Sequence, residues 1–226
     1  MQRSPELCKE AQKQALRELF RRDLFVTATE LCGYRDITWN THGPMITALE
    51  APTKRKLIVM PRGSFKSSVG TIAYSIWLLI RDPNVRILID SEVYKNSKNF
   101  LREIKNIIKS EKFKQVFGDW EGAIWTEGEI VVSKRTKNLK EGSIVCGGVE
   151  TVKVGAHFDV IIHDDMNSGN NSETVEMQEK VLRHYRMNFA ILDPGGIMVV
   201  TGTRYCVLDI IGTVLLEIER DKLGTF

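Results

Sequence analysis

The stretch LIVMPRGSFKSS, from Leu57 to Ser68, places an apolar strand, a short loop, a lysine and two serines in direct succession. A loop that joins a buried strand to a helix start attracts phosphate, because free N–H groups and the helix dipole favour an anion. Lys66 has the charge and reach to contact the outer phosphates of a nucleotide, and Ser67 has a hydroxyl suited to holding Mg²⁺. The stretch is therefore a candidate nucleotide site.

The loop departs from the usual pattern G-x-x-x-x-G-K-[ST]. Phe65 and Met60 stand where the two glycines are expected, and Gly63 is the only glycine in the loop. Taken alone, the stretch also fits a polar helix start capped by Ser64 or Ser67. Other parts of the chain have to decide between these alternatives.

The whole chain has the length and composition of one sizeable globular domain. Of its 226 residues 42% are hydrophobic and 27% charged, and the net charge is +3. The four cysteines are far apart without a CxxC pair, which argues against a zinc site or a disulfide scaffold and suits a reducing cytosol. The apolar run 69–80 is shorter than the ~20 residues of a membrane span, and the charged N-terminus is not a signal peptide.

Segments with strand and helix patterns alternate along the chain. Strands are expected at 57–60, 85–90, 158–163 and 197–201, with short strands between 124 and 148. Helices are expected at 6–32, 44–50, 67–81, 96–109, 173–190 and 208–219, and DPGG at 193–196 is expected to be a turn. This order predicts an α/β fold with a mainly parallel sheet covered by helices on both faces, and ligands at the carboxyl ends of its strands.

Two further strand ends carry polar residues suited to ATP chemistry. The stretch VIIHDDM ends in Asp164, which is placed to hold Mg²⁺ with Ser67, and Asp165, which is placed to activate water. Adjacent carboxylates are costly unless a cation shares them, although a solvated turn is the alternative for the pair by itself. The stretch VVTGTRY offers Thr201 or Thr203 as a sensor of the γ-phosphate. The three elements in this order favour an ATPase.

These residues resemble the ATPase domain of the large terminase subunit of tailed bacteriophages, the motor that packages DNA. The similar stretches are PRGSFKSS as the phosphate loop (Walker A), DVIIHDDM as the acidic strand end (Walker B), LDPGGIMVVTGTRY with DIIG as the coupling motif, and WNTHGPMITALE as the adenine-contacting segment. The resemblance covers roughly residues 35 to 220. It implies a P-loop ATPase domain of the additional-strand (ASCE, RecA-like) type at residues 35–226. A helical segment at residues 1–34 is expected to precede this domain.

The resemblance implies roles for individual residues. Asp165, Arg62 and Thr203 are expected to be catalytic, and Ser67 and Asp164 to hold Mg²⁺. Nucleotide contacts are expected from Pro61, Arg62, Gly63, Ser64, Phe65, Lys66, Ser67, Ser68, Trp39 and His42.

Three features depart from the family pattern. Phe65 is bulky for its position, and Asp165 is the shorter choice for the second acid. The segment ETVKVGAHFD at 150–159, where the family pattern leads us to expect an arginine finger, has no arginine, so the possible trans-acting cation is Arg135 or Lys153. The basic run at 134–140 is either a solvated face or a DNA contact, for which the candidates are Lys134, Arg135, Lys137 and Lys140.

The expected role is therefore ATP- and Mg²⁺-dependent translocation of double-stranded DNA into a procapsid. The resemblance implies a homo-oligomeric ring with portal and small-subunit partners, in the cytoplasm of an infected bacterium, without a membrane partner. We expect no nuclease activity, because the acids of a C-terminal nuclease domain are not in this chain. The alternatives are a catalytically weak nucleotide-binding or scaffold module and another nucleic-acid-stimulated ATPase, such as a helicase; a P-loop kinase fits less well.

Overall fold

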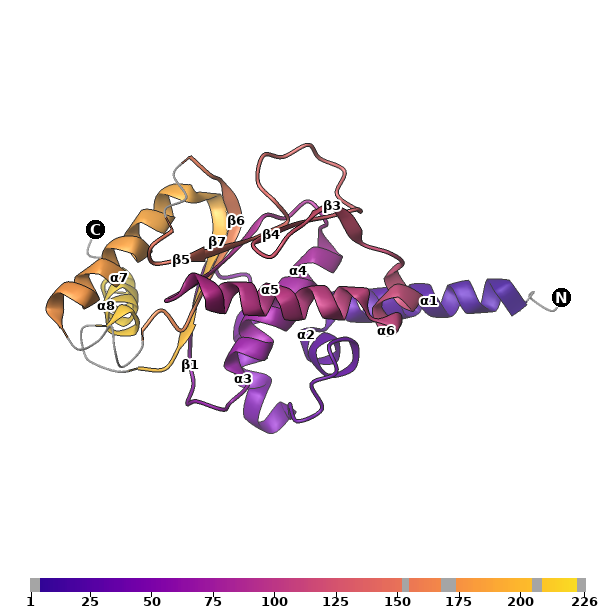
Figure 1. Cartoon of the computed structure of the whole chain (residues 1–226). Coiled ribbons are helices and arrows are strands. Elements are labelled where there is room, and N and C mark those ends of the chain that lie inside the picture. The colour runs from indigo at the N-terminus through magenta and orange to yellow at the C-terminus, as the bar shows by residue number, and fades with distance from the viewer. Residues whose placement is uncertain (1–4, 152–154, 168–173, 205–208, 223–226) are drawn as a thin grey trace.

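A computed structural model describes residues 5–151, 155–167, 174–204 and 209–222. These residues form a seven-stranded sheet with helices on both faces (Figure 1). The order across the sheet is β1-β7-β6-β2-β5-β4-β3. Neighbouring strands from β1 to β5 are parallel, and β4 is antiparallel to both of its neighbours, β5 and β3. The strands are β1 (Arg55–Val59), β2 (Ile87–Ser91), β3 (Glu121–Trp125), β4 (Glu129–Val132), β5 (Ile144–Gly148), β6 (Phe158–Asp164) and β7 (Leu192–Gly202). The predicted mainly parallel α/β sheet is confirmed.

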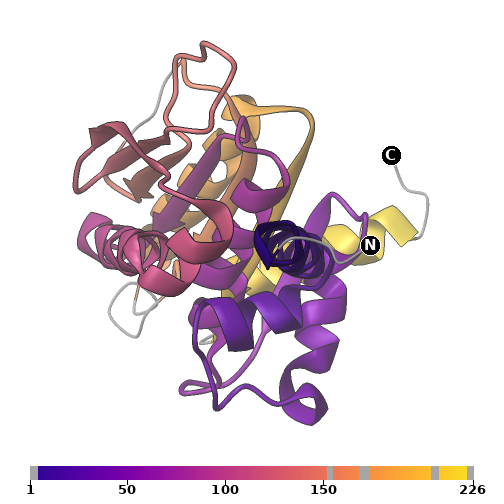
Figure 2. The same cartoon turned by 90° about the vertical axis from the view of Figure 1, so that its right-hand side faces the viewer.

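The helices form two layers, with α7 and α8 side by side on one face of the sheet and α3, α4 and α5 on the other (Figures 1 and 2). The α-helices are α1 (Pro5–Arg22), α2 (Leu24–Val26), α3 (Trp39–Glu50), α4 (Tyr74–Arg81), α5 (Tyr94–Lys109), α6 (Glu111–Phe117), α7 (Val175–Asn188) and α8 (Ile210–Lys222). The short helices are the π-helices η1 (Thr27–Leu31) and η2 (Ser68–Ala73) and the 3₁₀-helix η4 (Phe189–Ile191). No helix in the described part of the chain is long and apolar enough to span a membrane.

Each face of the sheet buries its own hydrophobic core, and β6 contributes to both. Ile162 packs in the core under α3, α4 and α5, whereas Ile161 packs in the core under α7 and α8. Side chains alternate between the faces of a strand, so Asp164 faces the same side as Ile162. His163 faces α7, where its ring packs against Tyr185. The alternation thus aims Asp164 at the helix that follows β1.

Strand β7 lies between β1 and β6, as the additional-strand type requires. Its end pairs with both neighbours: Gly202 is in register with Val59 of β1, and Thr201 is in register with Asp164 of β6. The carboxyl ends of three strands that are distant in sequence therefore meet at one edge of the sheet.

The predicted N-terminal helix at 6–32 is wrong as a single element. Asp23 interrupts it, because its Oδ1 accepts the N–H of Val26 at 2.9 Å and caps a new helix. A π-helical stretch follows at Thr27–Leu31. Phe20 and Leu24 of this segment pack into the same core as the helices near β1.

Two other boundaries differ from the sequence prediction. Pro44 was expected to begin a helix, but α3 begins at Trp39, because buried residues on both sides of the proline hold the longer helix in the core. The DPGG turn at 193–196 lies instead within β7, where the register against β6 shifts between Phe158 and Val160. Leu192 and Ile197 both pair with β6, so the extra residues bulge from a strand that continues.

Candidate nucleotide-binding site

The loop after β1 is tied to β7 and to itself by hydrogen bonds. Met60 donates its N–H to the carbonyl of Gly202 at 3.2 Å, and the Ser64 hydroxyl donates to the carbonyl of Pro61 at 2.7 Å. Gly63 takes φ +76°, the left-handed region that glycine enters without a steric cost. Arg62 is exposed in this loop. The loop therefore has a defined turn although both glycines of the usual pattern are missing.

Phe65 has the backbone conformation that explains why a glycine is usual at its position. Its φ is +56°, in the left-handed region that costs a side chain about 1–2 kcal/mol. Its ring lies edge-on to the ring of His42 in α3, with centroids 6.1 Å apart. Such a contact is worth about 0.5–1.5 kcal/mol, which is comparable with the strain. The loop is strained at this residue but keeps its turn.

Two hydroxyls on the helix after the loop contact Asp164. The Ser67 hydroxyl donates to one carboxylate oxygen at 2.9 Å, and the Thr71 hydroxyl donates to the other. Helix η2 is π-helical, a form that often occurs at functional sites. Thr71 was missed in the sequence analysis, although its spacing of four residues from Ser67 was the signal that could have found it.

Asp164 is fully buried. Burial raises its pKa to about 6, and the charge of Asp165 adds to this, while hydrogen bonds from Thr71 and Ser67 and the charge of Lys66 act against it. A raised pKa means that the carboxylate lacks sufficient positive charge around it. A hydroxyl and a carboxylate 2.9 Å apart supply oxygen ligands of the kind that Mg²⁺ takes beside a nucleotide. The residues present therefore fit the ion.

Asp165 pairs with Lys66 at the mouth of the site. Its Oδ2 lies 2.9 Å from Nζ of Lys66, whose side chain is only 7% exposed. Asp165 also takes a positive φ of 45°, and its N–H donates to the carbonyl of Thr201. Its Oδ1 is buried without a hydrogen-bond partner among the described residues. Lys66 and Asp165 are thus in direct contact, as expected if the loop and the acidic strand end form one site.

A row of polar side chains crosses the sheet at this edge. Ser91 of β2, Asp164 of β6 and Thr201 of β7 are in register. The hydroxyls of Ser91 and Thr201 are buried and lack a hydrogen-bond partner within the described residues. Thr203 donates its hydroxyl to the carbonyl of Met60 at 3.1 Å. Of the two threonines weighed as sensors, Thr201 is therefore the one beside Asp164, and Ser91 was not foreseen.

Helix α3 borders the loop with the two residues expected to contact the base. His42 is 4% exposed, and its Nδ1 lies 3.1 Å from the backbone nitrogen of Thr38. Trp39 is 54% exposed and packs edge-on against Phe25. The ring of His42 contacts the phosphate loop through Phe65, whereas the ring of Trp39 packs on the N-terminal helical segment.

The basic run lies at the opposite, amino-terminal edge of the sheet. Asn84, just before β2, accepts the N–H groups of Thr136 and Lys137 at this edge. Arg135 is half-buried and donates from Nη1 to the carbonyl of Glu141 at 2.6 Å, so it is not the freely exposed charge that was expected. Burial, followed by the charge of Arg86, lowers its pKa. The structure thus does not bring Arg135 to the phosphate loop of its own chain, and Lys153 lies outside the described residues.

The remaining basic candidates, Lys134, Lys137 and Lys140, are exposed. Lys140 donates to the carbonyl of Gly155 at 3.0 Å. Their assignment to DNA stays a prediction.

A buried polar network lies on the other face of the sheet. Asp90 accepts hydrogen bonds from His184 at 2.6 Å and Asn188 at 2.8 Å, and His163 lies 3.4 Å away. Burial alone would raise the pKa of Asp90, but the two histidines outweigh it and hold the pKa below its usual range. This network fastens α7 to β2, the neighbour of the strand that carries Asp164. It escaped the sequence analysis because its members are distant in sequence.

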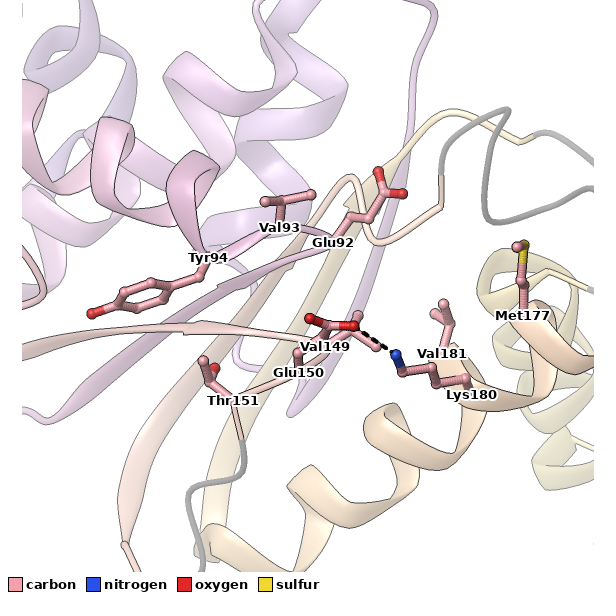
Figure 3. A pocket seen from close by; sticks show the side chains of 9 residues that line it. All are labelled: Glu92, Val93, Tyr94, Val149, Glu150, Thr151, Met177, Lys180 and Val181. Atoms are coloured by element: carbon pink, nitrogen blue, oxygen red, sulfur yellow. Dashed lines mark hydrogen bonds and ion pairs between the residues drawn. The ribbon is translucent and has the colours of Figure 1, made fainter.

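A pocket of about 520 Å³ lies at the ends of β2 and β5, beside the start of α5 and the side of α7 (Figure 3). Val93, Val149 and Val181 give it apolar walls, and an ion pair of 2.8 Å joins Glu150 to Lys180 among its lining residues. Its lining includes neither the phosphate loop nor the acidic pair. The pocket is therefore a neighbour of the candidate site and not its nucleotide cleft.

Comparisons with solved structures identify proteins of the same architecture. The chain superposes on the large terminase of bacteriophage HK97 with a TM-score of 0.62 at 8% identity, over 91% of this chain and 42% of that one. It superposes on an arginine-to-alanine mutant of the large terminase ATPase domain of Thermus phage P74-26 with a TM-score of 0.51 at 14% identity, over 78% of this chain and 68% of that one. A scan against family models and a search of curated proteins give no match.

The predicted resemblance is thus confirmed at the level of the fold: the chain has the fold of phage large-terminase ATPase domains. The chain spans less than half of the HK97 protein.

Proposed function

We propose that the chain is the ATPase motor domain of a phage DNA-packaging terminase, which hydrolyses ATP to drive double-stranded DNA into a procapsid. The assembly of Lys66, Ser67, Asp164 and Asp165 at one edge of the sheet, after β1 and at the end of β6, carries the proposal. The contact of Ser67 with Asp164 and the contact of Lys66 with Asp165 are both 2.9 Å. The fold shared with terminase ATPase domains supports the same assignment.

The residues divide the chemistry between them. Lys66 and the N–H groups of the loop would bind the phosphates, and Ser67 and Asp164 would hold Mg²⁺. The ion supplies positive charge to the phosphates as they react. Asp165 would orient the attacking water and take its proton. Lys66 contacts Asp165 at 2.9 Å, so binding of a phosphate by the lysine would leave the carboxylate available to the water.

Movement would pass from the site through β7. Thr201 lies beside Asp164, and Gly202 is bonded to the loop through Met60. Loss of the γ-phosphate would change the contacts of this strand end, and the segment after it would pass the change to a partner domain. The working motor would be a ring of copies of this chain, with portal and small-subunit partners, in the cytoplasm of the infected cell.

The test of the proposal is ATP binding and hydrolysis with Mg²⁺ by the native chain and by Asp165→Asn. We expect bound ATP in both proteins and turnover at least ~100-fold lower in the variant, because the general base is lost. The control is Asp119→Asn, an exposed site before β3 at the far end of the strand order, where asparagine keeps the acceptor for the Glu121 N–H. Equal turnover in Asp165→Asn and the control would refute the catalytic assignment.

The dependence of turnover on protein concentration tests the trans-acting cation. A rise steeper than proportional to concentration, abolished by Arg135→Gln or by Lys153→Gln, would identify the residue that a neighbouring copy supplies. A strictly proportional rise in all three proteins would exclude both candidates.

The DNA assignment predicts a change in salt dependence. Replacing Lys134, Lys137 and Lys140 by glutamine should weaken duplex binding and lower the slope of log affinity against log salt by up to ~2.7, because each phosphate that is no longer neutralised lowers the slope by about 0.9. Lys9, Lys13 and Lys112, which are also exposed, provide a control triple variant of equal charge. Equal slopes in the two triple variants would mean that DNA lies elsewhere.

A second candidate is a module that holds nucleotide with little turnover, which the strained Phe65 favours. ATP binding without hydrolysis at any concentration would support it. Strand separation driven by ATP would instead support a helicase.

A further inference from the structure

Two residues at the Lys66–Asp165 contact have unusual backbones: Asp165 itself and the residue before Lys66. Phe65 and Asp165 are the non-glycine residues with positive φ in the described part of the chain. Phe65 immediately precedes Lys66, and its carbonyl accepts the N–H of Val69, which starts the following helix. The left-handed conformation of Phe65 therefore sets both the direction of Lys66 and the first turn of that helix.

A side chain from another element contacts the Phe65 ring. His42 of α3 lies edge-on to it, with an interplanar angle of 76° and centroids 6.1 Å apart. His42 is almost fully buried, whereas Phe65 is 36% exposed. The histidine is thus the fixed member of the pair and the phenylalanine is the member that would otherwise be free to move.

Helix α3 is itself fastened to the strand before the loop. The buried Lys56 of β1 donates from Nζ to the carbonyl of Ala48 at 2.9 Å and to the carbonyl of Ala51. His42 therefore belongs to a helix that is hydrogen-bonded to β1, the strand at one end of the loop. It is suited to hold the other end through Phe65.

We propose that His42 and Phe65 are a positioning pair: the His42 ring holds Phe65 in its left-handed conformation and so keeps the loop and Lys66 ready for phosphate. This inference rests on the proposed nucleotide site. A glycine needs no such support, because it adopts the conformation without strain. The pair would thus replace the missing glycine, and the role of His42 would extend from the base side of the site to the phosphates.

The proposal predicts a specific order among four variants. Phe65→Ala keeps the strained Cβ but loses the ring, so the affinity for ATP should fall about fivefold to tenfold as the loop leaves the binding conformation. Phe65→Gly loses both strain and ring and should bind ATP at least as well as Phe65→Ala and close to the native chain. His42→Ala should weaken binding by a similar factor in the native background and leave it unchanged in the Phe65→Gly background.

ATP affinity with Mg²⁺ is measured by calorimetry on protein whose native fold is verified by circular dichroism. If the chain turns over ATP, KM should rise in His42→Ala and Phe65→Ala while kcat stays unchanged, because the pair acts before chemistry. His42→Phe, which keeps an aromatic ring, should restore the affinity. If His42 only packs in the core, His42→Ala should lower the stability of the protein equally with phenylalanine or glycine at position 65, and KM should not change.

Amide hydrogen exchange without nucleotide separates this inference from the proposed function. In His42→Ala, the amides of residues 62–69, including the Val69 N–H, should exchange faster than in the native chain, and the Phe65→Gly background should remove the difference. Equal exchange in native and His42→Ala protein, or an equal effect of His42→Ala in both backgrounds, would overturn the proposal. If the native chain fails to bind ATP, the nucleotide site is refuted, and the exchange experiment still decides whether His42 holds the loop.

Discussion

The two edges of the parallel sheet both carry clusters of charged side chains, but the clusters differ in how completely they are paired. At the amino-terminal edge, Arg86 forms ion pairs with Asp159 at 2.8 Å, with Asp193 and, at 3.6 Å, with Glu141. At the carboxyl-terminal edge, Asp164 is buried with a raised pKa and Asp165 has a buried oxygen without a described partner. At the first edge each of the three carboxylates is ion-paired with Arg86. At the second edge, among the described residues, only Asp165 is ion-paired, with Lys66, and Asp164 is hydrogen-bonded by hydroxyls alone.

The difference is the one we expect between a structural cluster and the proposed nucleotide site. The hydrogen bonds that Arg86 donates to Asp159 raise its pKa above the ordinary value, which shows that the fold stabilises its charge. At Asp164 burial raises the pKa of the carboxyl group, so there the fold disfavours the charge. Strained backbone at Phe65 and Asp165 adds to the cost at the same edge. Ligand charge arriving at this edge would compensate for what the chain itself leaves unbalanced.

The largest expected effect comes from removing the arginine that pairs the amino-terminal edge. Arg86→Met leaves three carboxylates facing one another and should lower the free energy of unfolding by about 3 kcal/mol, measured by urea denaturation. ATP affinity of the folded protein should not change. The control is Lys98→Met, which removes an exposed ion pair with Glu127 and should leave the free energy of unfolding nearly unchanged. Similar stabilities of the two variants would mean that the Arg86 cluster stabilises no more than a surface pair.

The next effect has the opposite sign. Asp164→Asn removes the buried charge and should raise the free energy of unfolding at pH 8 in EDTA by about 1–2 kcal/mol, less than the ~3 kcal/mol that the pKa rise from 3.8 to about 6 represents, because asparagine accepts fewer hydrogen bonds. The native state binds more protons than the unfolded state between pH 4 and 6. The native chain should therefore lose stability relative to the variant as pH rises through this window and keep a constant difference above it.

The control for this titration is Asp119→Asn, because the N–H of Glu121 lowers the pKa of Asp119. Its difference from the native chain should have the opposite sign, with the native chain losing its advantage as pH falls. With Mg²⁺ and ATP the order of stability of native and Asp164→Asn protein should reverse. A native chain that is more stable than Asp164→Asn in EDTA at pH 8 would contradict the unbalanced charge.

The smallest effect distinguishes two threonines at the carboxyl-terminal edge. Thr203→Val loses the hydrogen bond to the Met60 carbonyl and should cost about 1 kcal/mol of stability. Thr201→Val loses a hydroxyl without a described partner and should leave stability unchanged or slightly higher. If the Thr201 hydroxyl serves the nucleotide, kcat should fall about tenfold in Thr201→Val, the loss of roughly one hydrogen bond in the transition state. An equal loss of kcat in both variants would leave the two threonines without separate roles.

Sequence patterns predicted the elements of the site because each lies within a short segment. An apolar strand followed by Lys66 and Ser67, and another ending in Asp164 and Asp165, are recognisable from chemistry and order alone. The additional strand between them was predicted through the family resemblance and confirmed by the order β1-β7-β6. Such motifs are local, and parallel strand ends meet at one edge.

Contacts between distant segments were not predictable in this way. Ser91 joins the row beside Asp164 only through the pairing of β2 with β6, and Asp90 meets His184 only where α7 crosses the sheet. The break at Asp23 and the start of α3 before Pro44 also depend on burial, which periodicity does not report.

The sequence by itself determined the kind of sheet and the placement of Lys66 and Ser67 after one strand and of the acidic pair at the end of another, because strand, loop and helix propensities and the motif residues are all local. Only the tertiary structure decided that Phe65 takes the conformation of a glycine and meets His42, that Thr71 shares Asp164 with Ser67, and that Arg135 lies at the opposite edge. These outcomes depend on which faces pack together. That choice is set by the burial of the whole core and by strand register, which no single segment encodes.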